Sequence, residues 1–183
     1  REALRRLGRS AELQGRRRSM VIGAGAIGQL AAKVLAMRGH DVTVVDQSRS
    51  RLDLLGEGIR TATTFQELPE HELIIEATGS QSVLSRILKD SATGSTLLLL
   101  GFPYGLHSFN FESIVAFDRT VIGSVGSSGR DFEEALSVLP QLDLKGFLGV
   151  TVPLEEFERA LTLVKDKKHL KVMLHVDRSP GVA

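Results

Sequence analysis

The sequence contains no cysteine and no tryptophan, and only 5% of its 183 residues are aromatic. A chain without cysteine has no disulfide framework, no cysteine-ligated zinc site and no cysteine nucleophile. This absence is typical of a reducing compartment, so we expect a cytoplasmic location. The longest apolar runs, such as residues 96–100, are far too short to span a membrane, and the start of the chain lacks the apolar core of a secretory signal. We therefore expect no membrane partner.

Charge is nearly balanced overall but unevenly placed. Residues 1–18 carry seven arginines against two glutamates, a net charge of +5, which leaves 16 basic against 20 acidic residues in the rest of the chain. A basic start can contact nucleic acid, but no aromatic residues are interleaved with these arginines to stack on bases. An amphipathic helix with Ala3, Leu4, Leu7 and Ala11 facing inward explains the same residues. We favour this basic helix over a nucleic-acid partner.

Hydrophobic residues make up 42% of the chain, enough for one packed core around a parallel sheet. Short hydrophobic runs alternate with helical patterns, and parallel strands need crossover connections, which are right-handed. The alternation predicts an α/β fold: a three-layer, doubly wound parallel sheet of about six strands. The expected strands are 20–22, 42–45, 59–62, 73–77, 96–100 and 120–124, and the expected helices are 27–38, 49–55, 80–89 and 131–139. Glycine and proline after residue 100 favour a loop near a site over residues 102–119.

Three glycines lie between the first expected strand and the first long helix. Gly23, Gly25 and Gly28 form a G-x-G-x-x-G motif, and Asp46 ends the next strand 18 residues later. The first glycine permits a tight turn, the second lets the backbone approach a pyrophosphate, and the third lets the helix pack closely on the strand. This order of strand, turn, helix, strand and acid predicts a Rossmann fold that binds a dinucleotide.

Asp46 also bears on which dinucleotide is bound. Its carboxylate can accept hydrogen bonds from the ribose hydroxyls and would repel a 2′-phosphate, which favours NAD and makes NADP the less favoured cofactor. Arg49 and Arg51 leave the alternative open, because they can reach such a phosphate or can be ordinary residues of a helix surface.

With these motifs in place, the chain resembles the cofactor-binding, C-terminal Rossmann domain of the medium-chain dehydrogenase/reductase superfamily, which includes zinc-type alcohol, polyol, threonine and glucose dehydrogenases. The likeness runs from about Met20 to Val176 and includes IIEATGS, LLLLGF and RTVIGSVGSS. It is strongest in the ending VPLEEFERALTLVKDKKHLKVML, which generic Rossmann domains lack. Members often carry proline where this chain has Ala26, a small departure from the pattern.

The resemblance implies a set of residues that contact the cofactor. It places Gly23, Gly25, Ala26, Ile27 and Gly28 in the pyrophosphate loop, Asp46 and Arg51 at the ribose, Ala77 and Thr78 beside the cofactor, Gly101, Phe102, Ser124, Val125 and Gly126 around the nicotinamide, and Lys171 near the phosphates. Lys171 is equally consistent with a surface lysine on a terminal strand. Together with the basic helix 1–18, which the residue pattern predicts, the resemblance gives three segments, the other two being an NAD(P)-binding Rossmann domain 19–145 and a strand–helix–strand tail 146–183 packed on that domain.

Hydride transfer from an alcohol also requires removal of the hydroxyl proton, by a zinc-bound alkoxide or a positioned base. In the superfamily, the zinc ligands lie on a separate GroES-like catalytic domain, which this sequence does not contain. We therefore expect no catalytic residue and no metal ligand here, zinc only in the catalytic domain of the parent enzyme, and no turnover by this chain alone. His107 is either a catalytic histidine or a plain loop residue. Tyr104 is followed four residues later by Ser108 and not by lysine, which excludes the short-chain dehydrogenases.

We expect the chain to be the NAD(H)-binding domain of an alcohol or sugar dehydrogenase, whose parent enzyme moves a hydride between a hydroxyl carbon and nicotinamide C4. Two alternatives remain open: an NAD-sensing regulatory module without catalysis, and a zinc-independent quinone or enoyl reductase, a class that usually prefers NADP. The expected partners are the nicotinamide dinucleotide and a small alcohol or sugar in the parent enzyme. The resemblance also implies a homodimer, because members of the superfamily often join the sheet edges of two cofactor domains through the sixth-strand region, and an unpaired edge there would favour such pairing.

Overall fold

A computed structural model describes residues 17–65, 71–105, 108–147, 149–166 and 168–176. The basic helix expected over residues 1–18 lies almost entirely outside this described part, as does His107. Within the described ranges, no helix is long and apolar enough to cross a membrane. The chain divides into two compact units, one ending at Asp143 and the other starting at Leu144.

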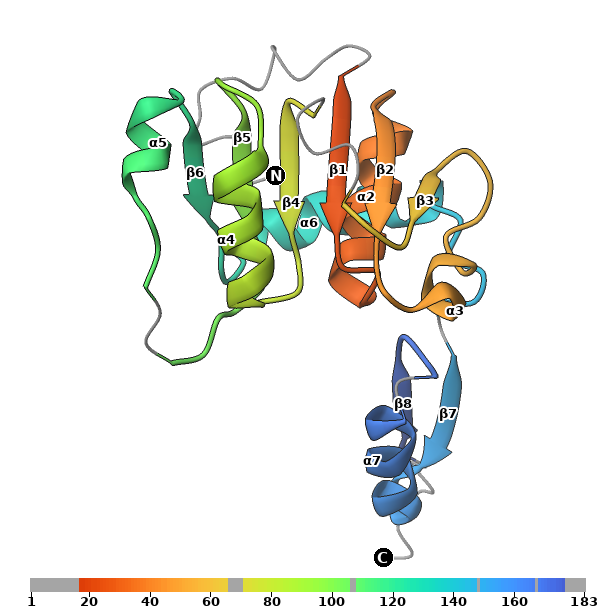
Figure 1. The fold of residues 1–183 in the computed structure, drawn as a ribbon. Coiled ribbons are helices and arrows are strands. Elements are labelled where there is room, and N and C mark those ends of the chain that lie inside the picture. Colours follow the sequence, from red (N-terminus) through yellow and green to blue (C-terminus); the bar gives the residue numbers. More distant parts are fainter. Residues whose placement is uncertain (1–16, 66–70, 106–107, 148, 167, 177–183) are drawn as a thin grey trace, which may run out of the picture. The chain divides into compact units, whose positions relative to one another are not determined.

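The first unit contains a six-stranded parallel sheet in the order β3-β2-β1-β4-β5-β6 (Figure 1). The strands are β1 (Arg18–Ile22), β2 (Asp41–Val45), β3 (Arg60–Ala62), β4 (Leu73–Glu76), β5 (Thr96–Leu99) and β6 (Thr120–Gly123). This order is that of the doubly wound dinucleotide-binding fold, with the change of direction between β1 and β4. The predicted Rossmann fold is confirmed, and each predicted strand is found within two residues of its expected bounds.

Helices connect these strands. They are α2 (Ala26–Met37), α3 (Arg49–Leu52), α4 (Gln81–Asp90), α5 (Glu112–Ala116) and α6 (Gly129–Val138), followed by the 3-10 turn η2 (Leu139–Gln141). The helix expected over residues 49–55 is shorter than predicted, because the chain turns after Leu52 toward Gly56, whose φ is 84°.

The expectation of a loop over residues 102–119 is wrong in its second half, where the chain forms α5. The side chain of Asn110 accepts a hydrogen bond from the Glu112 amide at 3.1 Å, and the Ser113 hydroxyl donates to the Asn110 carbonyl at 2.8 Å. These local bonds start a helix of five residues, which is too short to show a helical period in the sequence.

Two apolar clusters cover the two faces of the sheet. Alternate residues of β1 take opposite sides: Val21 packs with α2 residues such as Ala32, while Met20 and Ile22 pack with α4 residues such as Ile87. Figure 1 shows α4 in front of the sheet and α2 behind it. The three-layer arrangement follows from strands that are apolar on both faces.

The second unit is a small strand–helix–strand motif, as predicted for the tail. It consists of β7 (Val150–Pro153), the 3-10 turn η3 (Leu154–Glu156), α7 (Phe157–Lys165) and β8 (Val172–His175). The two strands pair in parallel, and Val152 and Ala160 are buried between strand and helix. That this tail packs on the Rossmann domain stays a prediction.

Candidate cofactor-binding site

The three glycines of the motif differ in the space around them. A Cβ atom on Gly28 would collide with the Gly23 carbonyl, and one on Gly23, whose φ is 103°, would lie 2.9 Å from Thr78 Cγ2. A Cβ atom on Gly25 would meet no atom within 4 Å. The first and third glycines are therefore required by packing, whereas the second leaves open space on the side from which a phosphate would approach.

Gly25 is also the N-cap of α2, and it has no side chain to accept hydrogen bonds from the amides of the first turn. Such free amides, together with the positive end of the helix dipole, favour an anion at this point. Ala26 and Ile27 form the start of this first turn. The residues present thus fit the pyrophosphate of a dinucleotide.

Asp46 follows β2 and contacts the phosphate loop directly. Its Oδ2 atom accepts a hydrogen bond from the Ala24 amide at 2.7 Å, and its Oδ1 atom accepts one from the Ser48 amide at 2.8 Å. Each oxygen retains a lone pair, so the carboxylate can hold the loop and still accept from ribose hydroxyls. The sequence predicted the contact with the ribose but did not reveal the bond that holds the phosphate loop.

Polar side chains on α2 support the segment after Asp46. The buried Gln29 amide donates to the Arg51 carbonyl at 2.8 Å and to the Ala24 carbonyl at 3.3 Å, and Lys33 Nζ donates to the Leu55 carbonyl at 2.8 Å. Arg49 forms an exposed ion pair with Asp53 at 3.0 Å, as expected for a helix-surface residue. Arg51 is half-buried on the same short helix.

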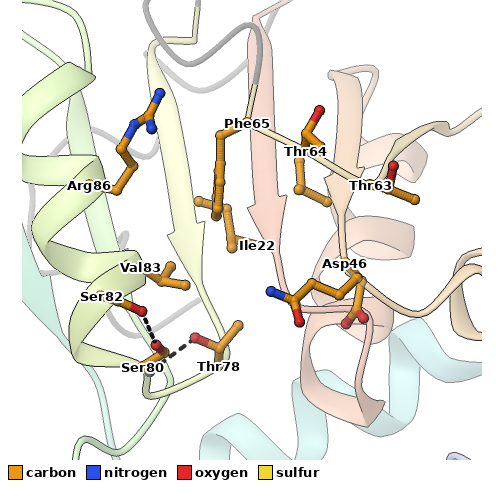
Figure 2. Close-up of a pocket in the computed structure, with 13 residues that line it drawn as sticks. Ile22, Asp46, Thr63, Thr64, Phe65, Thr78, Ser80, Ser82, Val83 and Arg86 are labelled. Atoms are coloured by element: carbon orange, nitrogen blue, oxygen red, sulfur yellow. Dashed lines mark hydrogen bonds between the residues drawn. The ribbon is translucent and has the colours of Figure 1, made fainter.

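A cavity of about 590 Å³ opens beside Asp46, at the carboxyl ends of β1 to β4 (Figure 2). Its apolar lining comes from Ile22, Val45, Phe65 and Val83, and its polar lining from Asp46, Gln47, Thr63, Thr64, Thr78, Ser80, Ser82 and Arg86. Figure 2 shows Asp46 and Arg86 on opposite sides of this cavity. The four apolar side chains suit a planar base, and the acid among the polar side chains suits a sugar diol attached to it.

The turn after β4, residues 77–80, brings the predicted residues Ala77 and Thr78 against the phosphate loop. A Cβ atom on Gly23 would lie 3.2 Å from the backbone of Ala77. Thr78 lies at the cavity, and its hydroxyl accepts a hydrogen bond from the Ser80 amide at 3.0 Å. Both predicted residues therefore lie beside the phosphate loop, and Thr78 also lines the Asp46 cavity.

The residues expected around the nicotinamide lie elsewhere. Phe102 and Val125 follow β5 and β6, and their side chains are 61% and 82% exposed. Ser124 and Gly126 line a separate hollow of about 250 Å³ beside α2 and α6. Gly101 is packed tightly against the backbone of Gly79. The structure does not gather these residues into the Asp46 cavity, and their contact with a nicotinamide stays a prediction.

Comparison of the sequence with known proteins gives a result that agrees with this geometry. The family model described as "Glucose dehydrogenase C-terminus" matches residues 2–176. The chain belongs to this family. The resemblance to the cofactor-binding half of the medium-chain dehydrogenases is thereby confirmed.

Individual relatives of this glucose dehydrogenase C-terminal family support the assignment. The chain is 34% identical over 176 residues to the glucose 1-dehydrogenase of Thermoproteus tenax, covering 86% of this chain and 50% of that protein. It is 31% identical over 173 residues to the sorbitol dehydrogenase of Halalkalibacterium halodurans, covering 85% and 50%. The chain thus spans about half the length of the curated relatives it matches.

Solved structures show the same fold. An alcohol dehydrogenase from Thermotoga maritima superposes with a TM-score of 0.82 at 22% identity, over 96% of this chain and 54% of that one. The glucose dehydrogenase of Haloferax mediterranei, described in complex with NADP, Zn and gluconolactone, gives 0.76 at 21% identity, over 98% and 56%.

Several cavity residues were missed by sequence reasoning. Thr63, Thr64 and Phe65 directly follow β3, and Ser80 to Arg86 run into α4 after β4. The signal that could have found them is their position, because ligands of doubly wound folds bind at the carboxyl ends of the strands. Within the described residues, no group of three or more histidine, aspartate or glutamate side chains could hold a metal ion.

Lys171 is exposed in the second unit, and its expected approach to the phosphates stays a prediction.

Arg119 carries a buried charge at the end of α4, outside the Asp46 cavity. Its guanidinium donates to the carbonyls of Leu88 and Ser91 at the end of α4 and lies 4.6 Å above the ring of Phe117. Burial lowers the pKa of Arg119, and the nearby charge of Asp90 partly offsets this effect. We interpret Arg119 as a helix-end residue outside the site.

Proposed function

We propose that this chain binds NAD(H), with the pyrophosphate on the loop at Gly25 and the adenosine half in the cavity beside Asp46. The observation that carries the proposal is the pairing of open space at Gly25 with an acid that lines a cavity of mixed polar and apolar surface beside the phosphate loop. Loop amides would bind the phosphates, and the carboxylate would orient the ribose. The cofactor, when bound, supplies the carbon that accepts or gives the hydride.

The carboxylate supports NAD over NADP. Asp46 lies where a ribose 2′-oxygen is expected, and a phosphate there would meet a like charge. Arg49 forms an ion pair with Asp53, and Arg51 on the same short helix is the other cation that a 2′-phosphate could use. NADP is therefore the weaker ligand in this proposal, although one structural neighbour is described as an NADP complex.

The parent activity follows from the relatives. Glucose and sorbitol dehydrogenases match this chain over half of their length, so we propose a sugar or polyol as the substrate of a parent oxidoreductase. The proton transfer, the substrate contacts and any zinc would belong to parts of the parent outside this sequence. A cytoplasmic location stays a prediction.

The test is a calorimetric titration of the chain with NADH and, separately, with NADPH. We expect micromolar binding of NADH and at least about tenfold weaker binding of NADPH. Equal affinity for both would contradict the role of Asp46, and binding of neither would contradict the proposed function. Adding a sugar or alcohol with NAD should give no turnover, and turnover would show that the chain carries its own catalytic groups.

Two further parts of the proposal have separate tests. Lys171→Ala should weaken NADH binding severalfold if this lysine reaches the phosphates, and unchanged binding would discard its role.

β6 is the last strand of the sheet order and offers an edge to a second copy of the chain. Light scattering at micromolar concentration is expected to show a dimer, and a monomer would contradict that pairing.

A further inference from the structure

Glu76 is the last residue of β4, and it is a charged side chain that is only 3% exposed. Its Oε1 atom accepts hydrogen bonds from the Thr78 amide at 2.7 Å, from the Thr78 hydroxyl, and from the Gly79 amide at 3.0 Å. A buried carboxylate is costly unless donors surround it, and all three donors come from the turn that follows the strand. The carboxylate and this turn therefore hold each other in one conformation.

The turn is wedged between two other strand ends. On one side, Thr78 Cγ2 would lie 2.9 Å from a Cβ atom on Gly23 in the phosphate loop after β1. On the other side, a Cβ atom on Gly79 would lie 2.7 Å from the Phe102 carbonyl oxygen in the segment after β5. Neither contact has spare room, so a shift of the turn would move both neighbours.

The carboxylate itself reaches the second neighbour. A Cβ atom on Gly101 would contact Glu76 Oε2, and the Glu76 carbonyl accepts hydrogen bonds from the amides of Leu100 and Gly101 at 2.8 and 3.0 Å. Glu76 thus contacts both the turn and the segment after β5. A glutamine can keep its carbonyl oxygen at the Oε1 position, but its NH₂ group would replace Oε2, which accepts from the Gly79 amide at 3.2 Å, and would set one N–H donor against another.

From these contacts we propose that Glu76 is a positioning residue: it holds the turn between the phosphate loop and the segment after β5, and so keeps the loop in the conformation that binds both phosphates of a dinucleotide. This inference rests on the proposed function, because the phosphate loop is the segment assigned to the pyrophosphate. A mononucleotide presents only one phosphate to the loop and depends less on its conformation.

Glu76→Gln is tested with Glu72→Gln as the matched control. Glu72 precedes the same strand, its side chain is 62% exposed, and it lies 3.7 Å from Arg17. Dissociation constants for NADH and 5′-AMP are measured at a temperature where circular dichroism shows each variant fully folded. We expect Glu76→Gln to weaken NADH about tenfold and 5′-AMP about threefold, and Glu72→Gln to change neither. If Glu76 only stabilises the fold, Glu76→Gln will lower the melting temperature and leave the dissociation constants of the folded protein for NADH and 5′-AMP unchanged. That result would overturn the inference.

If Glu76→Gln does not fold, Thr78→Val removes one donor to the carboxylate and keeps the side-chain shape. We expect this variant to weaken NADH about threefold and 5′-AMP by a smaller factor, and equal losses for the two ligands would overturn the inference. The wild-type titration separates the two proposals. Wild-type protein that binds no NADH overturns the proposed function and this inference together, whereas wild-type binding that the variants match overturns this inference alone.

Discussion

The two ends of the sheet's carboxyl edge differ in how far side chains of this chain line a cavity there. At the ends of β1 to β4, Asp46 holds the phosphate loop and a cavity of about 590 Å³ lies beside it. After β5 and β6, the residues Phe102, Tyr104 and Val125 lie outside the lining of that cavity and are 61%, 83% and 82% exposed. The ring centroids of Phe102 and Tyr104 lie 4.9 Å apart.

The difference follows from what surrounds each end. The cavity proposed for adenosine is lined by residues from four strand ends and the first turns of α4. Apolar side chains that remain exposed together are typical of surfaces that another group covers. We infer that this chain supplies a complete adenosine site and an incomplete nicotinamide site, and the variants below test that asymmetry.

The largest expected effect comes from the phosphate loop. Gly25→Ala should keep the fold, because its Cβ atom meets nothing within 4 Å, and should weaken NADH about a hundredfold by filling the path of the pyrophosphate. Gly129→Ala is the matched control, since its Cβ atom also meets nothing and the residue lies on α6. Calorimetry with a thermal melt measures both. Wild-type affinity in Gly25→Ala would refute the placement of the pyrophosphate.

Asp46→Ala should have the next largest effect, because it removes the proposed ribose acceptor and the bond from the Ala24 amide. We expect the NADH dissociation constant to rise about thirtyfold and the NADPH constant to rise less, which narrows the gap between them. Asp46→Asn keeps one acceptor oxygen without the charge and should narrow the gap with a smaller loss of NADH. An unchanged preference for NADH in both variants would contradict the assignment.

Phe65→Ala tests the apolar lining of the cavity. Loss of the ring should weaken NADH and 5′-AMP by the same factor, about fivefold, because base stacking on an aromatic ring contributes roughly 1 kcal/mol. Phe132→Ala removes an exposed ring on α6 outside the cavity and should change neither constant. If 5′-AMP binds Phe65→Ala as it binds the wild type, the base lies elsewhere.

The smallest effect is expected at the open end. The double variant Phe102→Ala and Tyr104→Ala should change NADH affinity by less than about twofold, because both rings are mostly exposed and lie outside the cavity. Fluorescence titration is sufficient for this comparison. A loss above about fivefold would show that the chain already forms a nicotinamide contact, and the asymmetry between the two ends would disappear.

Much of the fold could be predicted from the sequence, because strands buried on both faces are continuous apolar runs and the glycine spacing is fixed by backbone collisions. The position of Asp46 at the end of β2, beside the phosphate loop, also followed from the motif spacing, whereas its contact with a ribose stays a prediction. By contrast, α5 depends on local side-chain bonds of Asn110, and the Phe65 lining depends on how the end of β3 meets α4. The Asn110 bonds span only two or three residues and leave no helical period, while the Phe65 lining joins residues far apart in sequence, so no spacing rule predicts either.

The same limit applies to the interior of the site. The bond from the Ala24 amide to Asp46 and the three bonds on Glu76 involve residues that the motifs already contain, yet the motifs give only their order. Arg119, in contrast, belongs to no motif. A lone arginine before β6 has no pattern that would predict its buried contact with the end of a helix.

The most direct test of the asymmetry is a calorimetric titration of the wild-type chain with ADP-ribose beside NADH. ADP-ribose carries the adenosine and both phosphates and lacks the nicotinamide. If this chain completes only the adenosine end, the two dissociation constants should agree within about threefold. NADH binding more than about thirtyfold tighter than ADP-ribose would show that the nicotinamide site is already formed here and would contradict the account.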